Sequence, residues 1–137
     1  MQQHVGFQLL AFIALSTIIL PAQAPAQHAQ TKLLDCPQGD CELLRGAPET
    51  SGMRSGFVRL HPGEAVGWHT TGKNKEELVI LHGKGEAQID GQPSMSLAAP
   101  AVAYIPKNTR HNVQNTGSDT LEYVYVVAPT TGRSRNT

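Results

Sequence analysis

Residues 63 to 83 read Gly63-Glu-Ala-Val-Gly-Trp-His69-Thr-Thr-Gly-Lys-Asn-Lys-Glu76-Glu-Leu-Val-Ile-Leu-His-Gly83. A second stretch, further along the chain, reads Pro106-Lys-Asn-Thr-Arg-His111-Asn-Val-Gln-Asn115. His69 and His111 are the two histidines to follow, because each lies inside a patterned stretch of the kind that a metal-binding β-barrel needs.

Outside these stretches the chain is patterned as short strands separated by turns. No segment shows a sustained helical repeat, and β-prone runs alternate with Gly and Pro turns. Asp90-Gly91 predicts a hairpin, since both central positions of the favoured turn need positive φ, and we also interpret His82-Gly-Lys-Gly85 as a hairpin turn. We expect strands near residues 56–60, 65–68, 76–81, 86–89, 94–97, 102–105, 112–114 and 121–128. Eight short strands at this spacing suit an all-β antiparallel barrel or jelly roll.

The two stretches together resemble the two signature motifs of the cupin superfamily. The first family motif reads Gly, five residues, His-x-His, three or four residues, Glu, six residues, Gly. Gly63, His69, Glu76 and Gly83 fall at the matching offsets, while Thr71 stands where the family has its second histidine.

The second family motif reads Gly, five residues, Pro-x-Gly, two residues, His, three residues, Asn. Pro106, His111 and Asn115 match it, while Pro100 and Asn108 replace its two glycines. The resemblance covers roughly residues 53 to 129. It implies the fold of a small single-domain cupin, an antiparallel double-stranded β-helix or jelly-roll barrel, and it is much less specific to any one activity.

Strand parity alone does not decide which of two glutamates faces the barrel interior. Side chains two residues apart on a strand share a face. Glu76 and Glu77 are each followed at two-residue intervals by apolar side chains, so both faces are apolar. The family spacing selects Glu76, which six residues separate from Gly83. Glu77 remains the alternative if a bulge shifts the strand.

The resemblance implies a metal site formed by His69, Glu76 and His111. Two histidines and one carboxylate are the ligand set of non-haem Fe(II) facial-triad sites, and they leave positions open for water or substrate. The same set would hold Zn, Mn, Ni or Co, so we expect a divalent transition metal of unspecified identity. Metal-binding relatives usually add a fourth ligand at the position of Thr71. Its neutral hydroxyl is a poor ligand, so we expect weaker binding than in a four-ligand site. An empty barrel is the alternative, because metal-free cupins exist.

Cys36 and Cys41 enclose a short Pro-Gln-Gly-Asp turn. In an exported chain with an even cysteine count, a local disulfide is the natural interpretation. A reactive or metal-binding dithiol is the alternative, but no basic or histidine residue closely flanks the pair.

The N-terminal region is interpreted as a signal peptide at residues 1–26. It contains no Lys, Arg, Asp or Glu, Val5 to Leu20 is mostly apolar, and Ala24-Pro-Ala26 is the small-x-small pattern of a cleavage site. The n-region has only His4 where a Lys or Arg is usual, so a retained N-terminal membrane anchor is the alternative. We expect a linker and cysteine-containing segment at 27–52, the β-barrel at 53–129, and a flexible tail at 130–137. Localisation is accordingly predicted as secreted or periplasmic.

Charge and length limit the partners. The 137 residues suffice for one domain, and 11 basic residues balance 11 acidic ones. A nucleic-acid partner is not indicated, because such a protein normally shows a basic excess or stripe. The sequence instead indicates a small-molecule ligand or substrate. Dimers are common among similar cupins, so a homodimer is a further expectation.

Several aromatic and histidine residues have less specific interpretations. On a strand, Trp68 should face opposite to the neighbouring histidine, so we expect it in the core or in an interface. Tyr123 and Tyr125 share one face of the last strand and are expected in the core, with their hydroxyls at the rim. An alternative puts one of them at the pocket mouth. His61 and His82 lie at turns and are expected to be structural or solvated rather than ligands.

Three classes of function remain open from the sequence. The first is a metal-dependent enzyme acting on a small organic molecule, with dioxygenase-, isomerase- or lyase-like chemistry. The second is a non-catalytic cupin that binds a sugar-like ligand, and the third is a structural barrel with a vestigial site. Thr71 weakens the first class, and the intact His69, Glu76 and His111 weaken the third.

Overall fold

The structure is a computed structural model that describes residues 27–130. The expected leader and nearly all of the expected C-terminal tail lie outside the described residues. Within residues 27–130 the chain forms strands and no helix, so no helix there could cross a membrane. The strands are β1 (Cys41–Arg45), β2 (Arg54–Leu60), β3 (Asn74–His82), β4 (Lys84–Ile89), β5 (Met95–Ala98), β6 (Ala101–Ile105), β7 (His111–Gln114) and β8 (Leu121–Pro129).

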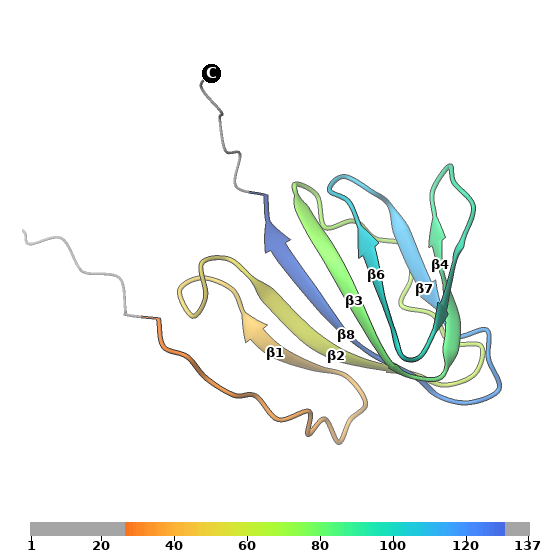
Figure 1. Cartoon of the computed structure of the whole chain (residues 1–137), viewed down its shortest axis with the longest axis horizontal. Helices are drawn as coiled ribbons and strands as arrows, with labels where there is room; N and C mark the ends of the chain where they lie inside the picture. Colours follow the sequence, from red (N-terminus) through yellow and green to blue (C-terminus); the bar gives the residue numbers. More distant parts are fainter. Residues whose placement is uncertain (1–26, 131–137) are drawn as a thin grey trace, which may run out of the picture.

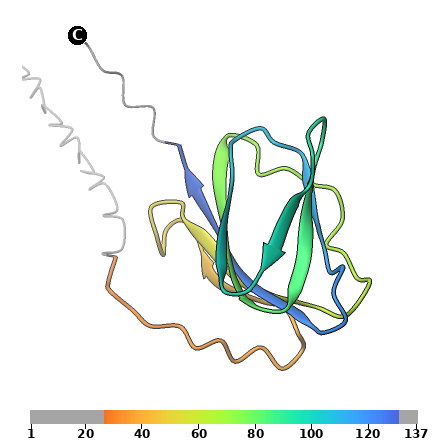
Figure 2. The same cartoon turned by 45° about the vertical axis from the view of Figure 1, so that its right-hand side comes forward.

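The strands form two antiparallel sheets whose inner faces enclose the core. A five-stranded sheet has the order β1-β2-β8-β3-β6, and a three-stranded sheet has the order β5-β4-β7. Figures 1 and 2 show the smaller sheet covering the β6 and β3 side of the larger one. The prediction of an all-β antiparallel jelly roll is confirmed.

Alternation along the strands builds the core. In the larger sheet, Gly56 of β2, Tyr125 of β8 and Leu78 of β3 are paired across neighbouring strands and therefore share the inner face. Side chains two positions further along, such as Ile80, point the same way, and Ile80 is 1% exposed. Complete burial of one such aliphatic side chain stabilises a fold by roughly 1.5–3 kcal/mol. The largest fully buried apolar side chains come from both sheets: Leu78, Ile80, Leu97, Ile105, Val113 and Leu121.

Two strand predictions are corrected by the structure. Residues 65–68 were expected to form a strand, but this segment makes only one isolated bridge to β7, at Ala65. Conversely, β1 was not predicted and adds an edge strand beside β2. The segment at residues 27–52, expected as a linker and cysteine-containing segment, includes β1 and the Cys36–Cys41 disulfide.

The prediction of a hairpin at His82-Gly-Lys-Gly85 is wrong. β3 and β4, on either side of Gly83, belong to different sheets, so the chain crosses from one layer to the other at this point. Gly83 has a φ of 79°, and a Cβ at this position would collide with the carbonyl oxygen of Thr120. Glycine is required there by both the backbone conformation and the close approach of a neighbouring strand.

Candidate metal centre

Two backbone segments bring the candidate histidines side by side. His111 is the first residue of β7, and His69 lies in the irregular segment that runs antiparallel to it. The amide N–H of each histidine donates to the carbonyl of the other, with both N–O distances 2.9 Å. Their ring centroids consequently lie 4.3 Å apart.

A bulge at Gly67 determines which way His69 points. The irregular segment bridges β7 at Ala65–Gln114 and at His69–His111. It therefore advances four residues (65 to 69) while β7 advances three (114 to 111). One extra residue on one strand is a β-bulge, which interrupts the alternation of side chains between the two faces.

The conformation of Gly67 matches this role. Its φ is 98°, a value that residues with a Cβ rarely adopt, and its N–H donates to the side-chain oxygen of Asn112 at 2.8 Å. The bulge leaves His69 facing inward and its neighbour Trp68 facing outward. The expectation of core packing for Trp68 is wrong, because its side chain is 45% exposed and its ring lies under the guanidinium of Arg110.

Glu76 reaches the site from the five-stranded sheet. It is paired with Val127 of β8 and Ile105 of β6, and it is 5% exposed. Glu77 points the other way, beside the exposed Tyr104. The structure thus turns inward the glutamate that the family spacing selected, and it leaves the alternative glutamate in solvent.

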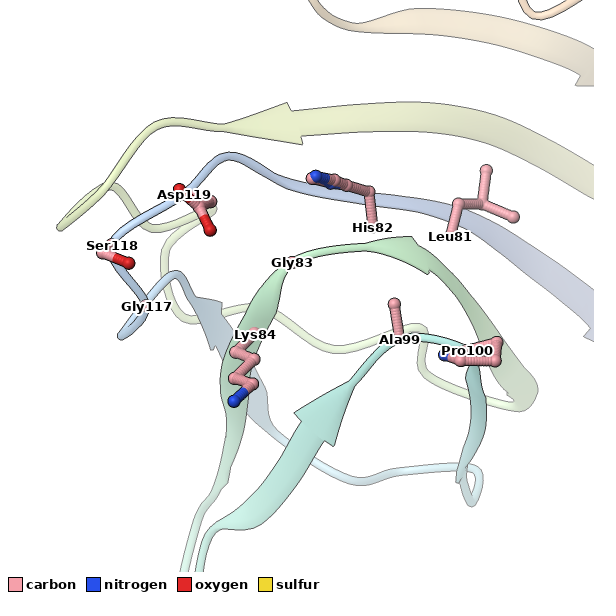
Figure 3. A pocket seen from close by; sticks show the side chains of 9 residues that line it. All are labelled: Leu81, His82, Gly83, Lys84, Ala99, Pro100, Gly117, Ser118 and Asp119. Atoms are coloured by element: carbon pink, nitrogen blue, oxygen red, sulfur yellow. The ribbon is translucent and has the colours of Figure 1, made fainter.

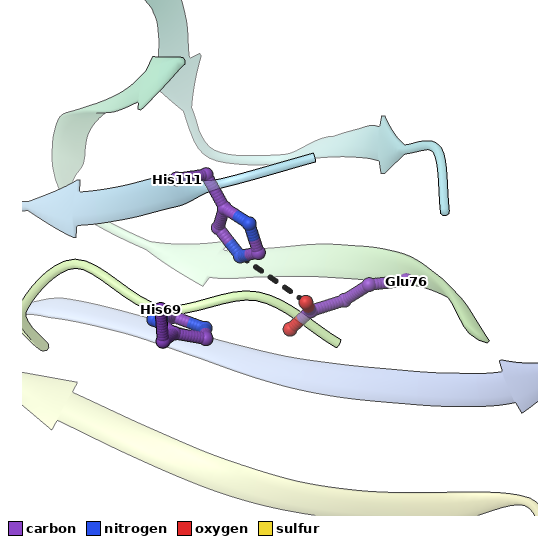
Figure 4. A group of neighbouring side chains, drawn as sticks. All are labelled: His69, Glu76 and His111. Carbon is purple, nitrogen blue, oxygen red and sulfur yellow. Dashed lines mark ion pairs between the residues drawn. The ribbon is translucent and has the colours of Figure 1, made fainter. Parts of the chain in front are cut away.

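The three side chains converge from two sides of the barrel. One potential ligand atom from each of His69, Glu76 and His111 lies within 4.8 Å of the others (Figure 4). The Nε2 atom of His111 is 3.2 Å from the Oε2 atom of Glu76. Ligand atoms that share one ion at about 2.1 Å lie no more than about 4.2 Å apart. The group therefore has nearly the separation that a shared ion requires.

Hydrogen bonds to the backbone assign the same tautomer to both histidines. The Nδ1 atom of His69 is 2.8 Å from the carbonyl oxygen of Gly67, and that of His111 is 3.1 Å from the carbonyl of Thr109. A carbonyl only accepts, so Nδ1 carries the proton in each ring. In the neutral imidazoles Nε2 then has a free lone pair, which a metal ligand needs. The other ring nitrogen, Nδ1, is held by a backbone carbonyl, as is usual for metal-binding histidines.

Two buried polar atoms in this group lack hydrogen-bond partners. They are Oε2 of Glu76 and Nε2 of His111. With the Nδ1 proton assigned, two electron-pair donors face each other across 3.2 Å in the interior. Such an arrangement is costly unless a cation or a proton lies between the two atoms. The residues therefore fit a bound divalent metal.

The protonation of His111 is consistent with this arrangement. Burial lowers the pKa of its imidazole, but the hydrogen bond to Glu76 that forms once Nε2 is protonated, the Thr109 carbonyl and the charge of Glu76 raise the pKa more. The net pKa lies above the ordinary histidine value. In the metal-free protein a proton therefore binds at the position where a metal would bind.

A cavity of about 280 Å³ opens beside two of the three side chains, His69 and Glu76. Much of its wall is apolar and consists of Val58, Val66, Val113 and Val127. Its polar lining, apart from the candidate ligands, consists of Arg54, Thr70, Thr71, Tyr123 and Tyr125.

Thr71 lies at this cavity but its hydroxyl is already engaged. The hydroxyl donates to the carbonyl oxygen of Asn74 at 3.0 Å. A hydroxyl in that role does not offer a charged ligand atom. The residues of the cavity thus supply two imidazoles and one carboxylate as strong ligands, with the fourth family position left to a neutral side chain.

The remaining residues of the second motif shape the loops on either side of β7. Asn115 directly follows β7, and its side-chain amide donates to the carbonyls of Leu60 and Asp119, both at 2.8 Å. The loop after β7 is thereby linked to the end of β2. Asn108, where the family has glycine, has a φ of 59°. Asparagine tolerates this left-handed conformation better than most residues, which explains the substitution.

The sequence left two positions open for the tyrosines of β8, the core and the pocket mouth, and the structure has one tyrosine in each. Tyr123 is buried in the core, and Tyr125 is partly exposed where it lines the cavity. Burial raises the pKa of Tyr123, so its hydroxyl keeps its proton at neutral pH. His61 and His82 are exposed and lie outside the candidate metal group.

A second hollow, of about 430 Å³, lies at the other end of β3 (Figure 3). His82, Lys84 and Asp119 are among the side chains around it. The metal-type groups found within residues 27–130 do not include these residues. This hollow contributes nothing to the candidate metal centre.

Three features of the site were not predicted from the sequence: the bulge at Gly67, the hydrogen bond that the Gly67 N–H donates to Asn112, and the position of Arg54 at the cavity. A glycine inside a strand-like run is a known signal of a bulge, so the first could have been found. The other two depend on contacts between distant segments.

Comparison with known proteins agrees with this geometry. A family model described as "Cupin domain" matches residues 56–127. "Polyketide synthase CurC" of Streptomyces cyaneus is 31% identical over 94 residues, which are 66% of this chain and 60% of that protein. "Tetracenomycin polyketide synthase protein TcmJ" of Streptomyces glaucescens is 25% identical over 130 residues, covering 93% of this chain and 79% of that protein. The match thus covers less than two thirds of the first relative and more of the second.

Solved structures share the same architecture. A cupin-like protein of Thermotoga maritima superimposes with a TM-score of 0.61 at 22% identity, over 66% of this chain and 68% of that one. A protein of Klebsiella pneumoniae with a double-stranded β-helix domain also gives 0.61, at 19% identity, over 74% and 91% of the two chains. At these identities the likeness establishes the fold alone.

Proposed function

The chain belongs to the cupin family, and from that premise we propose that it binds one divalent transition metal through His69, Glu76 and His111. The observation that supports the proposal most directly is the pair of partnerless buried atoms, Oε2 of Glu76 and Nε2 of His111. Iron, manganese, zinc, nickel and cobalt all suit this ligand set.

We propose further that the bound centre acts on a small organic molecule. Three protein ligands leave coordination positions open for water or substrate. The chemistry that a metal supplies in such a site is polarisation of a substrate oxygen or activation of dioxygen, which corresponds to dioxygenase-, isomerase- or lyase-like reactions. The chain's own contribution is to fix both imidazoles in the required tautomer and to surround the open side with valine side chains.

The cavity limits the substrate to a compact molecule. Its volume of about 280 Å³ lies just below the range of typical small-molecule pockets. Two relatives carry names of polyketide synthase proteins. These names support including phenols and enolisable carbonyl compounds among the candidate substrates.

Metal titration of single variants tests the metal site. We expect one metal per chain in the wild type, and its loss in His69→Ala and His111→Ala, because two remaining ligands hold an open site poorly against water. Glu76→Gln should weaken binding, since a neutral amide replaces the only carboxylate. Glu77→Gln is the matched control, because that side chain is exposed on the opposite face.

Two results would contradict the assignment. If Glu77→Gln proved the sensitive variant, the inward glutamate would be misassigned. If all four variants retained the metal, the site would lie elsewhere in the chain.

A non-catalytic binding function is the second candidate, and Thr71 is the residue that favours it. Its hydroxyl donates to Asn74 and leaves the fourth family position without a strong ligand. Oxygen consumption and product analysis with small phenols, enediols and sugars separate the two candidates. Turnover by the metal-loaded wild type supports the enzyme, whereas saturable binding without turnover supports the binding protein.

We also propose that the protein is exported to an oxidising compartment, secreted or periplasmic, with N-terminal membrane anchoring as the alternative. The support is the uncharged apolar N-terminal region and the Cys36–Cys41 disulfide.

A further inference from the structure

We propose that the cavity selects small organic anions, and that Arg54 and Tyr125 bind the anionic group while the metal side of the cavity holds the reacting end. This inference rests on the proposed metal site and adds to it the charge class of the ligand.

The position of Arg54 follows from the sheet register. Arg54, the first residue of β2, pairs with Val127 of β8, and Val127 pairs in turn with Glu76 of β3. Residues paired across neighbouring strands share a face, so Arg54 and Glu76 lie in one row on the inner face, about 10 Å apart between backbones. Both residues line the same cavity.

The charge of Arg54 is not neutralised by a neighbouring carboxylate. Among the arginines at positions 27–130, Arg59 pairs with Glu122 at 2.8 Å, and Arg45 and Arg110 each have an acidic partner within 4.0 Å. Arg54 has no such partner among the described residues. Arg54 is exposed and lines the cavity. An arginine in such a place without a counter-ion is suited to bind a carboxylate through paired N–H donors.

Tyr125 provides a second donor next to Arg54. It is paired with Gly56, two residues along β2 from Arg54 and on the same face. A Cβ at Gly56 would lie 2.6 Å from the ring and the hydroxyl of Tyr125, so the tyrosine lies directly over the glycine backbone. The absence of a side chain at Gly56 therefore sets the position of the phenol hydroxyl at the cavity.

The hydroxyl of Tyr125 is protonated at neutral pH. Burial raises the pKa of Tyr125, the charge of Glu42 raises it further, and the charge of Arg54 opposes the rise without cancelling it. A protonated phenol donates a hydrogen bond to an anion. Arg54 and Tyr125 thus present donors of the same kind to one end of the cavity.

The net charge of the loaded site favours an anion as well. Two neutral imidazoles, one carboxylate and a divalent ion carry a net single positive charge, and Arg54 adds a second. The rest of the wall is mainly valine. A compact organic acid, with an apolar body and one carboxylate or equivalent oxyanion, matches this lining in charge and polarity.

The test uses the full chain loaded with cobalt(II), with benzoate as the anionic probe and benzyl alcohol as its neutral counterpart. Calorimetry and the visible spectrum of cobalt report probe binding and metal binding separately. We expect Arg54→Gln to weaken benzoate binding about ten- to a hundredfold, the loss expected for one charge-assisted interaction, with cobalt affinity and benzyl alcohol binding unchanged. Tyr125→Phe should weaken benzoate binding several-fold, and Arg54→Lys should retain part of it.

Arg45→Gln is the matched control. Arg45 pairs with Arg54 across β1 and β2 but does not line the cavity. The Arg45→Gln substitution therefore removes one positive charge from the neighbouring strand and leaves the cavity lining unchanged. Equal effects of the two glutamine variants would mean that only overall charge matters, which overturns the inference. If the protein binds cobalt but neither Arg54→Gln nor Tyr125→Phe changes its affinity for benzoate, the inference is also overturned, while the proposed metal site is not affected. A wild type that binds no cobalt overturns the proposed function, and the inference with it.

Discussion

His111 and Glu76 form a buried pair in which each side chain has one polar atom without a hydrogen-bond partner. Both are nearly inaccessible, their facing atoms lie 3.2 Å apart, and each of these atoms lacks a hydrogen bond. Burying two polar groups in this way disfavours folding unless something binds between them. The same position is therefore available to a proton or to a metal, and the two compete for it.

This competition predicts how metal affinity depends on pH. Because the pKa of His111 is raised, the metal must displace a proton at pH values where an ordinary histidine is already neutral. Apparent affinity should fall as pH falls from above to below the raised pKa of His111, by up to about tenfold per pH unit for each displaced proton. Zinc or cobalt titrations at several pH values measure the slope. A constant affinity over this range would contradict the assignment of His111.

The stability of the metal-free protein should depend on pH in the opposite direction from metal affinity, so that it falls as pH rises. A raised folded-state pKa means that proton binding at His111 stabilises the fold at pH values below the unfolded value of about 6.5. That contribution is lost as pH rises through the raised folded-state pKa. Urea unfolding measured at several pH values, with and without metal, should therefore show the largest difference in the free energy of unfolding at higher pH.

Thr71→His tests what the fourth family position does. The imidazole would add a protein ligand in place of a hydroxyl that now donates to Asn74, so metal binding should tighten. Turnover that depends on an open coordination position should decrease. Thr70→His is the control, because Thr70 lines the same cavity but lies one residue before the fourth family position. Strong metal binding by the Thr71→His form alone, with an inactive wild type, would contradict the enzyme and favour the binding or vestigial alternatives.

At the scale of elements, the site depends on an irregular segment rather than on a regular strand. The segment carrying His69 contacts β7 only at isolated bridges, and the bulge between those bridges sets the histidine direction. Bulges often occur next to functional sites, where they redirect a side chain. Here the bulge places the second imidazole beside the first.

Gly67→Ala should disturb this arrangement. Alanine at a φ of 98° is strained by roughly 1–2 kcal/mol, and no neighbouring atom lies within 4 Å of the new Cβ, so the effect comes from the backbone alone. We expect lower stability together with weaker metal binding, as His69 moves. Gly91→Ala is the control, since Gly91 has a φ of 71° and open space around it but lies in the β4–β5 turn. Equal metal affinities in both variants would show that the bulge does not position His69.

The strands were largely predictable from the sequence because alternation and turn residues are local signals. Seven of the expected strands overlap observed ones, from β2 to β8. β1 was missed because a five-residue edge strand with one bulge carries little periodicity. The choice between Glu76 and Glu77 needed the family spacing, since both faces of β3 are apolar in sequence. The exposure of Trp68 and the position of Arg54 depend on a bulge and on sheet register, which no local pattern encodes.

At the scale of the whole molecule, the described chain is a two-layer barrel with an N-terminal extension on one edge. β1 lies at the β2 edge of the larger sheet, away from the three-stranded sheet (Figure 1). Cys41, the first residue of β1, forms the disulfide with Cys36. The extension is therefore expected to contribute stability rather than metal ligands.

Export and disulfide formation are tested together by intact mass. We expect the mature protein to begin near Gln27 and to be two hydrogens lighter than its reduced form, because Cys36 and Cys41 are paired. Reduction should lower the free energy of unfolding by about 2 kcal/mol, the value for closing so short a loop, and should leave metal affinity unchanged. A full-length mass with both thiols open to alkylation would remove the support for export and for the bond at once.

The candidate ligands come from both layers of the barrel: Glu76 from β3 of the larger sheet, His111 from β7 of the smaller one, and His69 from the segment beside β7. An ion held by all three would fasten the layers to each other at one end only. The chain itself crosses between the sheets at both ends, between β3 and β4 at Gly83 and between β6 and β7 just before His111. Opening of the barrel beside the histidines should then be limited by the β6–β7 crossing and, in addition, by a removable link. Amide hydrogens of β3 and β7 near the histidines should accordingly exchange faster after chelation, while those near Gly83 should change little.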